Sequence, residues 1–160
     1  MKATSMKALV LGLATACLLF AAAHAKPKDQ VGTGIITTTS ELNATAAMDK
    51  LMEIVTARGF AVAVRVNHAA AAATVDMDLR PTETLIFGNP VAGTPLMQEQ
   101  QSIALDLPLK LAVWQDADNK TIIAYNDPEF LASRHGITEN SMRISAQADF
   151  LKNVTAEAAS

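Results

Sequence analysis

The sequence predicts an α+β domain in which an antiparallel sheet carries its helices on one face. Segments with the period-two alternation of half-buried strands gather in the middle of the chain, and short polar turns separate them. Apolar residues recur at helical spacing before and after this group. Half of the 160 residues are apolar and 18% are charged, which excludes disordered, collagen-like and coiled-coil chains. Together these observations predict one core between a sheet and its helices.

Residues 1–25 have the organisation of a secretory signal peptide. Two lysines precede an apolar run over 8–20, and Ala23 and Ala25 supply the small residues that a signal peptidase requires. A transmembrane anchor would need roughly 20 apolar residues, and acylation of Cys17 would need a large aliphatic residue where an alanine stands. We therefore expect cleavage after Ala25 and a secreted or periplasmic protein without a membrane span.

Cleavage would change the chemistry that the chain offers. The remaining 135 residues would carry 11 basic and 16 acidic side chains, a net charge of −5, because two lysines leave with the signal. They would contain no cysteine, which excludes disulfides and thiolate metal sites. The acidic balance argues against a nucleic-acid partner. We expect a polar tail over 26–34 and a single domain over 35–158.

The first predicted elements are a strand and a helix. Residues 31–39 are rich in isoleucine and threonine, which favours a strand. Ser40 is expected to cap the following helix, since its hydroxyl can accept a free backbone N–H. Apolar residues recur at a spacing of three and four from Ala44 to Val55, and Gly59 supplies the left-handed residue that ends a helix.

A second strand, a short helix and a third strand follow. Phe60 and every second residue as far as Val66 are expected to form the buried side of a strand, and His68 continues that side. The alanine run over 69–73 predicts a short helix. Residues 84–87 predict a buried strand that ends at a glycine.

Residues 89–108 are expected to form a long loop with one short helix, because they hold three prolines. Loops of this length in a small domain are usually functional. At its start, glycines could let backbone N–H groups converge on an anion or a carboxylate. We name Asn89, Thr94 and Met97 as candidate ligand-binding residues, with a tightly turned connection as the alternative interpretation.

The second half of the domain is expected to hold a hairpin and two helices. Residues 109–113 and 121–125 alternate as strands, and the aspartates and asparagine between them suit a turn. Asp127 is placed to cap a short helix that begins with a proline and ends at Gly136. The last helix is expected over 140–158, with one apolar face.

Polar and aromatic side chains on the predicted hairpin form a candidate pocket wall. Lys110 and Trp114 share one face of their strand, with a small alanine between them. Tyr125 and Asp127 lie at the end of the next strand. Aromatic and cationic groups around a small residue suit a ligand. The alternative is that the aromatic rings close the edge of the core and that Lys110 is solvated.

His68 and His135 are the candidates for acid–base chemistry near neutral pH. With Met97 they could hold a soft metal ion such as copper(I), although no two of these ligands have a local spacing. The alternatives are a hydrogen-bonded histidine at a strand end and a helix-terminal residue. In an enzyme, Asp127 would orient the catalytic histidine. No serine or threonine forms a recognised catalytic motif with a histidine and an acid.

A series of short motifs runs through the domain in a distinctive order. They are the alanine run after His68, Leu79-Arg80-Pro81-Thr82, Phe87-Gly88-Asn89-Pro90, Gly93-Thr94-Pro95-Leu96-Met97, Asp106-Leu107-Pro108-Leu109-Lys110, Trp114, Tyr125-Asn126-Asp127-Pro128 and Arg134-His135-Gly136. This series resembles a bacterial domain-of-unknown-function family, number 302, over residues 35–137. The resemblance implies a TATA-binding-protein-like fold, a strand and a helix followed by four strands and a closing helix, and a homodimer. It brings no established activity and no agreed catalytic residues.

Three functions stay open at this point. The chain could be a secreted module that binds a small molecule or a metal ion, a hydrolase or lyase that uses His68 or His135 as acid and base, or a structural homodimer without a ligand. The binding module is favoured, because the distinctive residues concentrate at strand ends and in one long segment rather than in the core. No particular cofactor is indicated.

Overall fold

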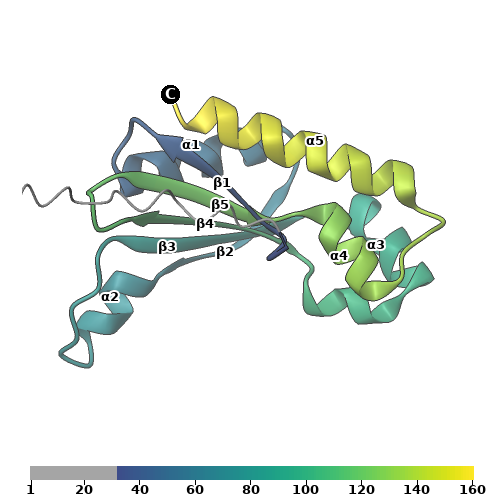
Figure 1. The fold of residues 1–160 in the computed structure, drawn as a ribbon, viewed down its shortest axis with the longest axis horizontal. Coiled ribbons are helices and arrows are strands. Elements are labelled where there is room, and N and C mark those ends of the chain that lie inside the picture. The colour runs from purple at the N-terminus through teal and green to yellow at the C-terminus, as the bar shows by residue number, and fades with distance from the viewer. Residues whose placement is uncertain (1–31) are drawn as a thin grey trace, which may run out of the picture.

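The computed structural model describes residues 32–160, and the predicted signal peptide over 1–25 lies outside the described residues. Its strands form one antiparallel sheet in the order β1-β5-β4-β3-β2, with helices around it (Figure 1). The strands are β1 (Ile35–Ser40), β2 (Ala61–Asn67), β3 (Thr82–Gly88), β4 (Leu109–Gln115) and β5 (Thr121–Asn126). The helices are α1 (Ala44–Ala57), α2 (His68–Ala73), α3 (Pro90–Glu99), α4 (Pro128–His135) and α5 (Ser141–Ala158), with a 3-10 helix η1 (Gln101–Leu105).

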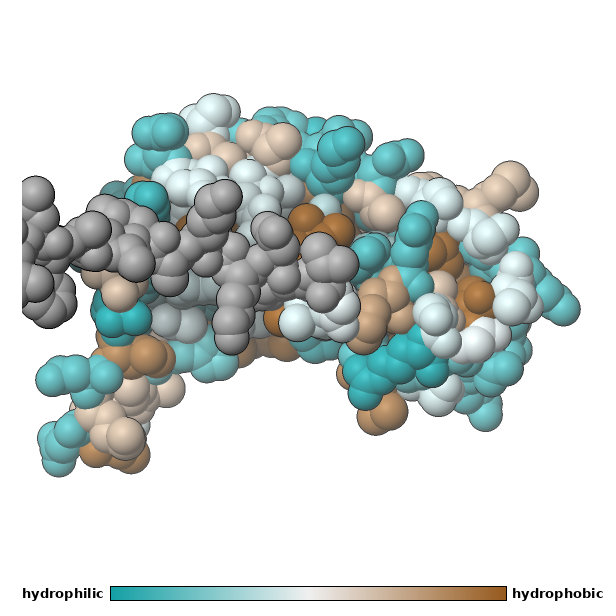
Figure 2. All heavy atoms as spheres, viewed as in Figure 1, coloured by the Kyte–Doolittle hydropathy of each residue, from teal (hydrophilic) through white to brown (hydrophobic). Residues whose placement is uncertain are grey.

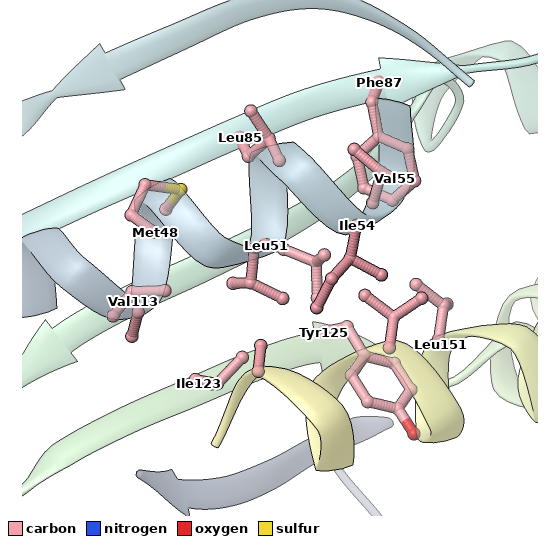
Figure 3. Close-up of a cluster of buried hydrophobic side chains, with 14 of the residues drawn as sticks. Met48, Leu51, Ile54, Val55, Leu85, Phe87, Val113, Ile123, Tyr125 and Leu151 are labelled. Carbon is pink, nitrogen blue, oxygen red and sulfur yellow. The ribbon is translucent and has the colours of Figure 1, made fainter. Parts of the chain in front are cut away.

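Helices α1 and α5 pack against each other and cover one face of the sheet (Figure 1). The main core lies between them and the sheet, and it holds the fully buried side chains of Met48, Leu51, Phe87, Val113 and Ile123 (Figure 3). Burying each large apolar side chain of this kind contributes roughly 1.5–3 kcal/mol. The predicted α+β fold, with an antiparallel sheet and helices on one face, is confirmed.

A second, smaller apolar cluster lies beyond one end of the sheet. It contains Leu96, Ile103, Ala132, Ile137 and Ile144. These residues come from α3, η1, α4, the segment after α4, and α5, and Figure 1 shows the short helices grouped beside the sheet. We call α3, η1 and α4 the lobe, and this set of five residues the lobe cluster.

The helix predicted after the first strand is confirmed, but Ser40 does not cap it. Helix α1 begins after Asn43, whose side-chain oxygen accepts the Ala46 N–H at 2.9 Å. Ser40 is the buried last residue of β1, and its hydroxyl donates to the Ala159 carbonyl at 3.1 Å. The serine therefore ties the first strand to the end of α5. The helix ends before Gly59, which has a φ of +79° as the prediction required.

Strand β2 departs from the simple alternation predicted for it. A bulge between Val62 and Val64 shifts the register, so Val62 pairs with Phe87 beside the core, whereas Val64 pairs with Ile86 and is 44% exposed. His68 consequently does not continue a buried side. It is exposed and begins α2, the predicted alanine helix, in which no residue is buried.

The segment predicted as a long loop folds mainly into two helices, α3 and η1. Asn89 accepts the Val91 N–H at 2.9 Å with its side chain, and Pro90 occupies the first helical turn, where its missing N–H costs nothing. The fully buried Leu96 anchors α3 in the lobe cluster. Pro95 lies inside the helix and cannot donate to the Val91 carbonyl, but Val91 is 77% exposed, so water can reach that site.

The predicted hairpin and the later helices are confirmed. Strands β4 and β5 pair in antiparallel register, and Asn119 takes a φ of +61° in their turn. Helix α4 begins at its cap Asp127, whose carboxylate accepts the Glu129 N–H at 3.0 Å, and ends at Gly136 with a φ of +71°. The last predicted helix is α5, which begins at Ser141.

The face of the sheet opposite α1 and α5 carries no described helix across its centre (Figure 1). Lys110, Ala112 and Trp114 alternate with the core residues of β4 and lie half-buried on this open face, as predicted for Lys110 and Trp114. Figure 2 shows that the outline of the molecule is hollowed below the sheet, between α2 and the lobe. The open face is therefore flanked by a projection at each end.

Candidate functional site

A cavity of about 450 Å³ opens at the end of the sheet next to the lobe. Strand β2 begins, β3 ends and β4 begins at this end, and α3 forms the facing wall. Gln147 reaches the cavity from α5. The larger apolar residues of the lining are Phe60, Pro90, Met97, Leu107, Pro108 and Leu109.

Small residues create the space in this cavity. Gly93 faces it from α3, and a Cβ atom built there would lie 3.6 Å from Cδ1 of Leu107, an ordinary contact distance. At the end of β3, a Cβ atom on Gly88 would lie 3.2 Å from Cβ of Pro108. The chain turns from β3 into α3 at Asn89, so the cap of the helix also fixes the edge of the cavity.

Stacked aromatic rings support the apolar wall of the cavity. Phe60 stacks on Phe150 with ring centroids 4.4 Å apart, and it meets Phe87 edge to face at 5.6 Å. The Arg58 guanidinium carbon lies over the Phe150 ring, 5.9 Å from its centre. These contacts hold Phe60 in place, because aromatic pairs in such geometries add to the stabilisation from burial.

The polar groups of the cavity are uncharged. They belong to Asn89, Thr94 and Gln147, and none of the lining residues, all of which lie within 32–160, carries a charge. Cavities of roughly 300–1,000 Å³ with an apolar lining and a few polar groups bury small organic molecules. A bare ion would find no countercharge there. The cavity therefore suits an uncharged and largely apolar molecule.

Glu99 joins the α3 wall to the start of α5. Its carboxylate accepts the backbone N–H groups of Thr138 at 2.5 Å, Glu139 at 2.8 Å and Asn140 at 3.1 Å. These hydrogen bonds, led by the one from Thr138, lower the pKa of Glu99 to about 2. A carboxylate from α3 thus holds the segment that leads into α5, whereas the Asn140 side chain makes no cap for that helix.

A second constellation lies where η1 meets α4. The Ser102 hydroxyl lies 3.0 Å from Nδ1 of His135, and Nε2 of the same ring lies 2.6 Å from Oδ2 of Asp106. The His135 side chain is 5% exposed and that of Asp106 is 13% exposed, whereas Ser102 is exposed. Arg134 Nη1 also lies 3.4 Å from Oδ2 of Asp106. A hydroxyl, an imidazole and a carboxylate therefore form one hydrogen-bonded series.

The structure gathers three of the predicted binding residues at the cavity. These are Asn89, Thr94 and Met97, which come from the segment predicted as a loop and stand on or beside α3. His68 does not join them. It lies at the α2 end of the sheet, with Nε2 3.0 Å from Oγ1 of Thr84.

The other predicted site residues have partners elsewhere. Lys110 donates to two backbone carbonyls just before β4, at 3.0 and 3.1 Å, and Trp114 lies on the open face. Tyr125 belongs to the core (Figure 3), where burial and, to a lesser degree, the charge of Asp127 raise the pKa of its hydroxyl. Asp127 caps α4. It does not orient His135, whose carboxylate partner is Asp106 instead.

The proposed soft-metal ligands His68, Met97 and His135 do not come together. His68 starts α2 and His135 ends α4, and these helices lie at opposite ends of the molecule (Figure 1). Met97 lies at the cavity instead. Within residues 32–160, no group of three histidine, cysteine, aspartate or glutamate side chains is placed to hold a metal ion.

The sequence did not reveal several residues of the cavity or of the Ser102, His135 and Asp106 series. Gly93 appeared only as one of the glycines whose backbone N–H groups could bind an anion or form a tight turn, and Leu107 had no assigned role, because each matters through a contact between distant segments. Ser102 and Asp106 are four residues apart, about one turn of helix. That spacing could have paired them once the segment was assigned as helical, but nothing local connects them to His135.

Comparisons with known proteins identify a family and a fold. The family model described as "Domain of unknown function DUF302" matches residues 36–158. A crystal structure of an uncharacterized conserved protein, DUF302, from Bacillus stearothermophilus superposes with a TM-score of 0.71 at 18% identity. The superposition covers 78% of this chain and 98% of that one.

Curated relatives match a shorter region. Proteins named "Fluoride-specific ion channel FluC 1", from Brucella suis biovar 1 and Brucella abortus biovar 1, are 36% identical over 107 residues. The match covers 67% of this chain but 42% and 40% of those proteins, so it spans about two fifths of their length. In the part of the chain that the structure describes, no helix is both long and apolar enough to cross a membrane.

Proposed function

The chain belongs to the DUF302 family of domains of unknown function, and from that premise we propose that it is a binding module for a small, uncharged and largely apolar molecule. The cavity of about 450 Å³ carries this proposal. It lies at the end of the sheet, between elements of the main core and α3 of the lobe. Its size and lining match those of sites for small organic ligands.

The polar groups of the cavity define one end of the ligand. The Thr94 hydroxyl and the Gln147 amide make no hydrogen bond with other described residues, and the Asn89 side chain uses only its oxygen, to accept the Val91 N–H. These groups could therefore serve a hydroxyl, carbonyl or amide on the ligand. The rest of the ligand would lie against apolar residues such as Phe60.

N-phenyl-1-naphthylamine tests the proposal, because this uncharged aromatic probe fluoresces more strongly in an apolar site. The unchanged protein should bind it saturably. Gly93→Phe should weaken binding at least about tenfold by filling the space beside Leu107. Gly93→Ala adds one methyl group at ordinary contact distance and should keep most of the binding, while stabilising α3 by about 0.5–1 kcal/mol.

A matched control separates cavity filling from the addition of a phenyl ring. Ala146 is exposed on α5 and does not line the cavity, so Ala146→Phe should leave probe binding unchanged. The binding function is contradicted if the unchanged protein shows no saturable binding. It is also contradicted if Gly93→Phe and Ala146→Phe bind the probe equally well.

We do not extend the proposal to fluoride transport. The Brucella relatives carry the name of a fluoride channel, but the match spans only about two fifths of each of them. The cavity here also lacks a cationic side chain that would compensate an anion. The uncharged lining of the cavity favours a neutral ligand for this domain.

We also propose that the protein is exported and cleaved after Ala25. The two lysines, the apolar run over 8–20 and the small residues before Lys26 support this proposal. The intact mass of protein from a periplasmic extract should correspond to a chain that begins at Lys26. A mass that retains residues 1–25, or a lipid on Cys17, would contradict it.

A homodimer is the final part of the proposal. The open face of the sheet presents Val64, Ile86, Trp114 and Ile122, of which Val64 is 44% exposed and the others are half-buried. Paired strands place Val64 beside Ile86 and Trp114 beside Ile122, and exposed apolar patches can mark protein interfaces. Light scattering at micromolar concentration should give twice the monomer mass, and Val64→Lys should halve it. A monomer mass for the unchanged protein would contradict the dimer.

A further inference from the structure

We propose that Ser102, His135 and Asp106 form a site that hydrolyses carboxylic esters. The substrate would be an ester whose carbonyl group is sterically unhindered, so that it can reach Ser102 at the protein surface. The hydroxyl is the nucleophile, the imidazole is the base, and the carboxylate positions the imidazole. None of the three residues lines the cavity. This inference therefore goes beyond the proposed binding function, and its test is independent of that function.

The proposed reaction requires one arrangement of protons in this series. A carboxylate can only accept, so in that arrangement Nε2–H of His135 donates to Asp106 at 2.6 Å. The lone pair on Nδ1 then faces Ser102, whose hydroxyl donates to it at 3.0 Å. A serine that donates to an imidazole oriented by an acid is the arrangement that activates the hydroxyl for acyl transfer.

Burial along the series suits this chemistry. His135 is 5% exposed and Asp106 is 13% exposed, so their hydrogen bond is sheltered from water. Ser102 is exposed, so a substrate carbonyl can reach its oxygen. The charged groups beside Asp106 are cationic: Arg134 Nη1 lies 3.4 Å from its carboxylate and Lys110 Nζ lies 3.0 Å from its backbone carbonyl. They supply compensating charge for the sheltered carboxylate.

The reaction balances with water as the co-reactant. Oγ of Ser102 attacks the carbonyl carbon while its proton passes to Nδ1 of His135. The bond from that carbon to the alcohol oxygen breaks, and the proton passes to the departing oxygen, which leaves an acyl ester on Ser102. Water then attacks the acyl carbon and gives a proton to Nδ1. The bond to Oγ breaks and Oγ recovers this proton, so one ester and one water yield one acid and one alcohol.

A fluorophosphonate probe tests the nucleophile, because an activated serine forms an oxygen–phosphorus bond with it and releases fluoride. The purified full chain is incubated with the probe, and the labelled residues are mapped by mass spectrometry. Ser102 should be labelled at least about tenfold faster than Ser145, an exposed serine on α5 that has no histidine partner. Ser102→Ala should remove the fast labelling.

Variants of the partners separate catalysis from a structural link between η1 and α4. His135→Gln should slow labelling of Ser102 at least about 100-fold. Asp106→Asn should slow it at least about tenfold and by up to about 10⁴-fold, and the conservative Asp106→Glu should restore much of the rate, as expected for a positioning residue. A purely structural link would lower thermal stability in these variants without changing the ratio of Ser102 to Ser145 labelling.

The ratio of Ser102 to Ser145 labelling rates in the unchanged protein tests the proposal even where a variant does not fold. Equal labelling of Ser102 and Ser145 would overturn the proposal. Fast labelling of Ser102 that persists in folded His135→Gln would also overturn it.

Discussion

Arg65 and Glu83 form a buried ion pair beside α1, and removing the arginine tests what the pair contributes. Nε of Arg65 on β2 donates to Oε2 of Glu83 on β3 at 2.5 Å, and the same guanidinium pairs with Asp49 on α1. The hydrogen bond that Arg65 donates to Glu83, above all, raises the pKa of the Arg65 guanidinium. Because Glu83 is 3% exposed, Arg65→Met leaves a buried carboxylate without its cation.

The expected loss is about 3 kcal/mol. Removing one partner of a buried ion pair costs about 3–5 kcal/mol. The lower end applies here, because the Arg65 side chain is 25% exposed and water can enter the space that it leaves. Asp49 is 58% exposed, so the loss of its partner adds at most about 1 kcal/mol. Replacing both partners, as Arg65→Met with Glu83→Leu, should cost less than about 1 kcal/mol, since two apolar side chains need no charge compensation.

Urea unfolding measures both variants. Trp114 is the single tryptophan of the sequence, so its fluorescence reports on the sheet. At an unchanged m value, the midpoint should fall for Arg65→Met and recover most of the way in the double variant. An equal loss in the two variants would refute the reasoning, because it would attribute the loss to packing rather than to the unpaired carboxylate.

Three other substitutions test the supports of the fold. Glu99→Gln should remove an acid-sensitive contribution to the stability of the fold. The pKa of Glu99 is lowered from 4.5 to about 2, so the ionised carboxylate stabilises the fold above pH 4.5 and this stabilisation is lost as the pH falls towards 2. Thermal melting of the unchanged protein and the variant across that pH range will show the difference. Gly34→Ala should lower the free energy of unfolding by about 1–2 kcal/mol in chemical denaturation, because φ is +69° and the new Cβ atom would lie 2.3 Å from the Phe130 ring. Gly32→Ala is the control, since Gly32 also has a positive φ but a Cβ atom there would meet no atom within 4 Å. Asn89→Ala should cost about 1 kcal/mol in the same assay by removing the cap of α3.

Local sequence patterns were sufficient to predict those elements whose geometry depends on neighbouring residues alone. The alternation that begins at Leu109 predicts β4, and the structure confirms that Leu109, Leu111 and Val113 are buried. Gly136 ends α4 with a positive φ, and Asp127 caps it, because these two roles depend on neighbouring residues alone. Such features could be predicted without knowing what packs against them.

Two segments differ from the prediction because the deciding interactions are not local. The bulge after Val62 is set by the pairing of β2 with β3, so the period of the sequence could not reveal that Val64 is exposed. Pro95 argued against a helix, but the burial of Leu96 in the lobe cluster outweighs the hydrogen bond that the proline removes. Contacts between distant parts of the chain therefore determine both the bulge in β2 and the helix at Pro95.

The candidate sites likewise depend on contacts between segments that are far apart in the sequence. The predicted residues Asn89, Thr94 and Met97 meet at the cavity, although on a helix rather than on a loop. Their facing wall comes from residues near 60, 107 and 147, which only the packed sheet and helices bring together. His135 was identified as a candidate by its residue type, but its partner Asp106 lies 29 residues away along the chain.

The division of the apolar interior into two clusters has a consequence for how a molecule would reach the cavity. Helix α3 is anchored through Leu96 to the lobe cluster, whereas Leu109 on the other wall belongs to the main core. Leu107 packs against both. Regions with fewer buried contacts open at lower free energy than the whole domain. Backbone amides of α3 should therefore exchange with deuterated solvent through partial openings that leave the sheet intact. Such an opening would separate the two walls of the cavity and admit the ligand proposed above.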